Sequence, residues 1–208
     1  MIEFKGIKKL MRNPFGANLR GMAGAMVERM GLIPPQRAAI YSIWDVEHWR
    51  RDEAGELYLL DVTRDTNLVV NEGLDDILDT YFKSGTQITT WYVCIFEDDY
   101  TVLATNTYAS KGFTESTAYD ETVRPTWTGG SVSGQSVDNS ASKATFTMND
   151  TKTIYGAALV GGTNAATKND STSGSANVMY CSAQFAASKS VVDDDVLKVT
   201  VTLTSSSV

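Results

Sequence analysis

The sequence contains few residues of the types and spacings that catalytic sites use. The only histidine, His48, lies in the strand-like segment WDVEHW. A site that needs two or more histidine ligands therefore cannot form. A Ser-His-Asp triad needs a positioned serine, and no G-x-S-x-G motif precedes a helix-like segment. We interpret His48 as a strand residue with a satisfied hydrogen bond. We predict no catalytic residues and a protein that is not an enzyme.

The densest group of carboxylates is Asp193, Asp194 and Asp195. Three carboxylates can bind Ca²⁺, but the spacing of a calcium-binding loop is missing. The group lies between two strand-like segments, where a polar turn is needed in any case. We therefore favour a turn over a metal site, and we expect no metal and no cofactor.

Five aromatic residues in strand-like segments could line a sugar-binding site. They are Trp91, Tyr92, Trp127, Tyr155 and Tyr180. Aromatic residues in strands are more often core residues or cross-strand pairs, and we favour that interpretation. Cys94 and Cys181 also lie in apolar strand-like runs, and we expect buried free thiols.

Charge is distributed unevenly along the chain. Residues 1–37 hold seven Lys and Arg against two Glu, a net charge of +5, whereas residues 38–208 carry −12. A solvated tail is one interpretation of this asymmetry. The other is an arm that docks on an acidic surface. Nucleic acid is not expected as a partner, because the body offers no basic patch.

Residues 1–37 are predicted to form an N-terminal docking arm, extended or helical, ahead of a body formed by residues 38–208. A short helix is expected over residues 19–30, where three methionines recur at every fourth position. Such a short helix is not stable alone, so it must pack on its own body or, as we prefer, on a neighbour, since Pro34 and Pro35 separate it from the body. The expected contact residues are Phe4, Lys8, Arg12, Phe15, Arg20, Met22, Met26 and Met30.

Two strand-like segments, residues 39–49 and 56–64, look like a hairpin joined by a polar turn. Residues 71–82 then give the clearest helix signal, with Asn71 as the expected N-cap and Glu72 in the first turn. Its apolar residues fall on one face. They are Leu74, Ile77, Leu78, Tyr81 and Phe82.

The rest of the chain reads almost entirely as strands. They are expected at residues 86–96, 113–119, 144–149, 152–160, 177–185 and 197–204. A tight hairpin is predicted around Asp150 and Thr151, and a long flexible loop over residues 161–177. The fold class is therefore mainly β: an antiparallel β-sandwich, jelly-roll-like, with one short helix after the first hairpin. No apolar run suits a membrane span, and no secretory signal is expected.

The body carries an ordered series of motifs: NLVVNEGLDDILDTYF, GTQITTWYVCIFEDDYT, FTESTAYDETVRPTW, NSASKATFTMNDTKTIYGAALVGG and VVDDDVLKVTVTLT. Over residues 67–204 this series resembles a family of tailed-phage virion structural proteins, some labelled head-decoration and others tail-fibre proteins. Residues 1–37 lie outside the resemblance, and the motifs mark no catalytic residues.

The resemblance implies a capsid decoration (cement) protein on the outer surface of the phage head, assembled in the host cytoplasm. Its expected partners are the major capsid protein and copies of itself in a homotrimer. A receptor-binding or glycan-binding protein of the tail fibre is the alternative. A depolymerase enzyme is the least favoured option, because no catalytic constellation is recognisable.

Overall fold

A computed structural model describes residues 38–174 and 176–207, and residues 39–206 form one compact unit. The predicted helix at residues 19–30 and all eight expected contact residues lie outside this part. Within it, the chain forms nine strands and one helix, α3 (Asn71–Phe82). The predicted class, a mainly β antiparallel sandwich with one helix after the first hairpin, is confirmed.

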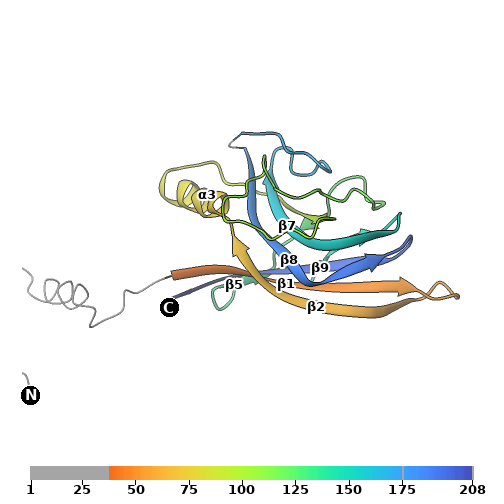
Figure 1. Ribbon diagram of the computed structural model, residues 1–208. Helices are drawn as coiled ribbons and strands as arrows, with labels where there is room; N and C mark the ends of the chain where they lie inside the picture. The colour runs from red at the N-terminus through yellow and green to blue at the C-terminus, as the bar shows by residue number, and fades with distance from the viewer. Residues whose placement is uncertain (1–37, 175, 208) are drawn as a thin grey trace, which may run out of the picture. The chain divides into compact units, whose positions relative to one another are not determined.

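Two sheets that share β2 form the sandwich, and they appear as two layers in Figure 1. The first sheet has the order β2-β1-β9-β5, with β6 also paired to β9. The second sheet has the order β4-β3-β7-β8-β2. The strands of the first sheet are β1 (Ala38–Arg51), β2 (Leu57–Val69), β5 (Ser136–Asp138), β6 (Ala144–Thr147) and β9 (Val196–Ser207). Those of the second sheet are β3 (Trp91–Phe96), β4 (Thr126–Trp127), β7 (Lys152–Gly162) and β8 (Asn177–Val191).

The predicted first hairpin is confirmed, and its second strand joins the two sheets. β1 and β2 pair antiparallel from Arg51 opposite Leu57 to Ser42 opposite Asn67. The last two residues of β2 pair instead with β8, where Val69 lies opposite Cys181. The start of β1 lies beside the end of β2, and α3 begins immediately after β2. β1 and α3 therefore start at the same end of the sandwich.

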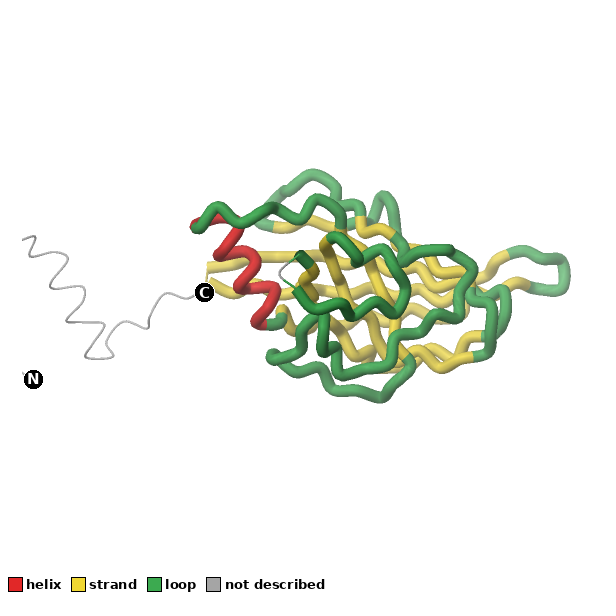
Figure 2. Tube along the Cα trace, turned by 90° about the horizontal axis from the view of Figure 1, so that it is seen from above, coloured by secondary structure: helices red, strands yellow, loops and turns green. Residues whose placement is uncertain are grey.

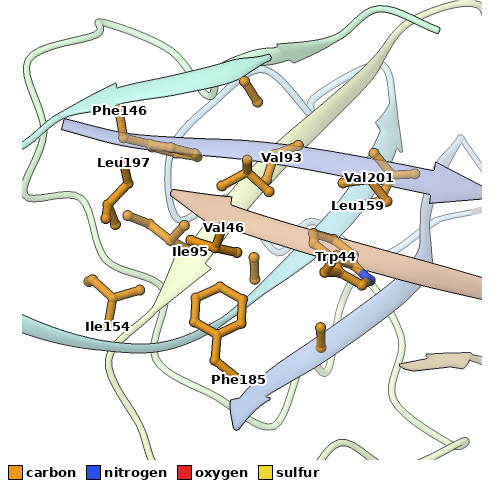
Figure 3. Packing of buried hydrophobic residues seen from close by; sticks show 14 of the residues in the cluster. Trp44, Val46, Val93, Ile95, Phe146, Ile154, Leu159, Phe185, Leu197 and Val201 are labelled. Atoms are coloured by element: carbon orange, nitrogen blue, oxygen red, sulfur yellow. The ribbon is translucent and has the colours of Figure 1, made fainter. Parts of the chain in front are cut away.

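The main core lies between the two sheets, as Figure 3 shows. β1 contributes Trp44 and Val46, and β9 contributes Leu197, Val199 and Val201 from its alternating pattern. The second sheet also buries its outer face, where loops cross over the strands in Figure 2. This double burial explains why WYVCIF in β3 reads as a continuous apolar run rather than an alternating one.

Three details of the sequence prediction are wrong. The strands around Asp150 do not pair with each other, because β6 pairs with β9 while β7 pairs with β3 and β8. Residues 113–119 make only isolated bridges, at Glu115 and Tyr119. Val70, not Asn71, occupies the N-cap position of α3 and makes no side-chain cap. The reason is that β2 stays extended up to Val70, whose side chain is buried in the outer core.

Candidate functional site

An aromatic pocket lies at the end of the sandwich where α3 begins. The pairing of β3 with β4 sets Trp91 directly opposite Trp127. Trp91 meets Tyr180 of β8 edge to face, with ring centroids 5.7 Å apart. The indole N–H of Trp127 donates to the carbonyl of Val201 at 3.0 Å, which fixes that ring against the first sheet. Three of the five aromatic residues singled out in the sequence therefore meet here.

Helix α3 forms the remaining wall of this pocket. Its residues Asp76, Ile77, Thr80 and Tyr81 face the aromatic group, and the pocket has a volume of about 260 Å³. That volume suits one or two apolar side chains, or a single sugar ring, better than a larger cofactor. Tyr92 and Tyr155, the other two aromatic candidates, do not line it.

One carboxylate and two neutral polar groups line the otherwise apolar pocket. They come from Asp76, Thr80 and Gln87. Burial raises the pKa of Asp76, and repulsion from Asp79 raises it further. The pocket can therefore hold an apolar group and offer hydrogen bonds at its rim.

The outward face of α3 carries an exposed apolar stripe, defined here as Leu74, Leu78, Tyr81 and Phe82. Leu78 is 54% exposed, Tyr81 81% and Phe82 72%. The sequence predicts that these residues share a face, but in the structure only Ile77 of the predicted set turns into the core. Large apolar residues that are exposed side by side mark contact sites more often than single ones do.

The start of α3 is held rigidly against the body. The carboxylate of Glu72 accepts backbone N–H groups from Tyr108 and Met179, each at 2.7 Å. Gly73 lies directly against the backbone of Tyr180. The stripe is therefore presented on a fixed element rather than on a mobile loop.

A buried ion network fixes the loops on the outer face of the second sheet. Arg124 and Glu115, both with side chains at most 1% exposed, form a bidentate pair at 2.6 and 2.5 Å. Lys111 lies 3.5 Å from the same carboxylate. Burial disfavours the charged form of Arg124, but its hydrogen bonds with Glu115 outweigh this and raise its pKa.

This network also reaches the long loop after β7. Arg124 donates to the carbonyl of Ala165 at 2.9 Å, and Lys111 donates to that of Asp170 at 2.5 Å. The predicted loop lies between the end of β7 at Gly162 and the start of β8 at Asn177, and these bonds tie Ala165 and Asp170 to the body. We assign the network a structural role, because Arg124 and Lys111 both bind groups of the protein itself.

His48 is hydrogen-bonded, as the sequence predicts. Its Nε2 lies 2.8 Å from Oδ2 of Asp195, and Arg50 donates to both oxygens of the same carboxylate at 2.8 and 2.7 Å. Asp193 and Asp194 lie exposed in the predicted turn, whereas Asp195 is buried. Within the described residues, no group of three or more His, Cys, Asp or Glu could hold a metal ion.

No family model, curated protein or solved structure matches the chain. No helix in the described part is long and apolar enough to cross a membrane. Both predicted thiols, Cys94 and Cys181, are buried and free, and burial raises the pKa of each to about 12. The aromatic pocket and the stripe of α3 are candidate functional surfaces.

Proposed function

We propose that the protein is a non-enzymatic structural subunit of a tailed-phage particle, a cement protein that stabilises the outer surface of the head. The major capsid protein and further copies of the chain are its partners. The ordered motifs over residues 67–204 support this proposal through their resemblance to phage virion proteins. A compact body with a core of its own agrees with such a role, because a cement subunit must fold before it binds.

The observation that carries the proposal is the exposed apolar stripe on α3. The stripe lies on a rigid helix and is flanked by Asp75 and Asp79, which are also exposed. An apolar centre with a charged rim is the usual composition of a surface that binds another protein. The stripe is therefore a candidate surface for a contact with another protein subunit.

Removal of residues 1–37 tests this proposal. We expect residues 38–208 to keep the circular dichroism spectrum and cooperative melting of the full chain, since the described core uses no residue before Ile40. We also expect the shortened protein to lose co-sedimentation with undecorated phage heads, because the contacts of the arm are gone. Head binding equal to that of the full chain would refute the role of the arm.

The aromatic pocket favours a second candidate, glycan binding by a tail-fibre protein. Trp91, Trp127 and Tyr180 could stack on a sugar ring while Asp76 and Gln87 accept and donate hydrogen bonds. A glycan array separates the two functions. Reproducible saccharide binding that Tyr81→Ala abolishes would favour the tail fibre, since Tyr81 is largely exposed and its loss leaves the core intact.

A further inference from the structure

The stripe of α3 and the aromatic pocket form one continuous surface. Tyr81 belongs to both, because it lines the pocket and also packs edge to face on Phe82, with ring centroids 5.0 Å apart. The stripe runs from Leu74 to Phe82, eight residues along the helix. At 1.5 Å per residue that is a row of about 12 Å ending beside a pocket.

Carboxylates border this surface. Asp75 and Asp79 are exposed on α3, and Asp76 lies at the rim of the pocket. The helix itself carries no basic residue, and Lys83 directly after it pairs with Asp79 at 3.6 Å. A partner that fits must therefore combine an apolar row with positive charge.

Residues 19–30 of this chain have that chemistry. Met22, Met26 and Met30 recur at every fourth position, so on the predicted helix they form a row that also spans eight residues. Arg20 and Arg29 belong to the same segment, within an arm of net charge +5. Methionine adapts its shape to irregular apolar surfaces, so it suits the end of the row that meets the pocket.

We propose that the stripe of α3 and the adjoining pocket receive residues 19–30 of a second copy of this chain. Seven residues, 31–37, lie between this segment and β1, and they include Pro34 and Pro35. Consecutive prolines disfavour a tight turn of the backbone, which is why we assign the segment to the α3 of a second copy rather than to its own. The inference rests on the proposed function, since it names the partner that the arm grips.

Cross-linking between two different full-length variants tests the contact. Chains with Leu78→Cys are mixed with chains with Met26→Cys and oxidised mildly, both free and on phage heads. A disulfide between them can form only between copies. We expect a covalent dimer to form at least about tenfold faster than in a mixture of Val62→Cys and Met26→Cys, because docking raises the local thiol concentration. Val62 is a matched control, apolar and 49% exposed on β2.

The native thiols do not interfere, since Cys94 and Cys181 are fully buried. Adding Phe82→Asp to the Leu78→Cys chain is expected to slow the dimer about tenfold, because it places a charge in the apolar row. Position 82 is largely exposed, so this variant should fold. A chain carrying both cysteines reports a contact within one copy by closing a disulfide with the loss of two hydrogens, while it remains a monomer.

Three results would overturn the inference: a dimer rate equal to the control, a disulfide only within one chain, or a rate unaffected by Phe82→Asp. Head binding by the full chain is measured in the same samples. If heads bind the protein while no cross-link forms between copies, the inference fails and the proposed function stands. If heads do not bind it, the proposed function fails.

Discussion

Among single residues, Gly73 sets how closely α3 approaches the second sheet. A Cβ at this position would lie 2.4 Å from the backbone oxygen of Tyr180. Alanine normally stabilises a helix interior by up to about 1 kcal/mol relative to glycine. A clash with the backbone of a central strand costs more, typically about 1–3 kcal/mol. We therefore expect Gly73→Ala to lower the free energy of unfolding by at least about 1 kcal/mol in urea denaturation.

Gly130 provides the matched control for this substitution. A Cβ there would lie 3.6 Å from the backbone oxygen of Asp138, an ordinary contact distance. Gly130→Ala should therefore change the free energy of unfolding by less than about 0.5 kcal/mol. If both variants behaved alike, close packing of α3 on Tyr180 would not be what holds the helix in place.

The elements themselves were largely predictable where local pattern decides structure. The periodicity of residues 71–82 predicts α3, and the alternation from Leu197 to Leu203 predicts β9. Local sequence signals did not predict which strands pair with each other. A turn at Asp150 and Thr151 predicts a hairpin, but a turn signal cannot say that the next strand crosses to the other sheet.

The candidate site was predictable only in part, for the same reason. The sequence marks Trp91, Trp127 and Tyr180 as aromatic strand residues, but only the pairing of distant strands brings them together. It also predicts that Leu78 and Phe82 share a face, and helix periodicity cannot tell whether that face is covered. Asp195 looks like one of three turn residues, and its burial depends on Arg50 from a strand far away in the chain.

The connection between β3 and β4 depends on its buried ion pair more than on secondary structure. Replacing Glu115 by Gln would leave the buried charge of Arg124 without its counter-charge, and Lys111 would lose the same counter-charge. Loss of one member of a buried pair costs about 3–5 kcal/mol. We expect that loss in the free energy of unfolding of Glu115→Gln, and a smaller loss than the sum of the single effects when Arg124→Met is added.

An exposed pair on α3 provides the contrast. Lys83 and Asp79 are 75% and 57% exposed in their side chains. Lys83→Met should therefore change the free energy of unfolding by less than about 1 kcal/mol. Strictly additive effects of Glu115→Gln and Arg124→Met would show that the two side chains do not act as a unit.

The molecule as a whole should be sensitive to acid, because several carboxylates are ionised in fixed partnerships. Burial alone would raise the pKa of Asp195, but hydrogen bonds from Arg50 and His48 outweigh burial and lower it. Hydrogen bonding to Lys189 likewise lowers the pKa of Asp61. A carboxyl with a lowered pKa stabilises the fold above its unfolded pKa, about 3.9 for Asp, and this stability is lost as pH falls through the folded pKa.

Asp195→Asn isolates one part of this acid sensitivity, that of a carboxylate that joins β1 to the turn before β9. At neutral pH the free energy of unfolding of the variant should be about 2 kcal/mol lower, because charged hydrogen bonds to Arg50 and His48 are weakened. As pH falls below about 4, the usual pKa of an Asp in an unfolded chain, the difference from the native chain should shrink, because the unfolded native chain then binds a proton that the folded Asp195 does not. Asp193→Asn, exposed in the same turn, is the control and should change stability little at any pH. Urea denaturation from pH 2.5 to 8 measures the free energy of unfolding of both variants. If the difference between the native chain and Asp195→Asn stayed constant over this range, protonation of Asp195 would not contribute to the loss of stability in acid.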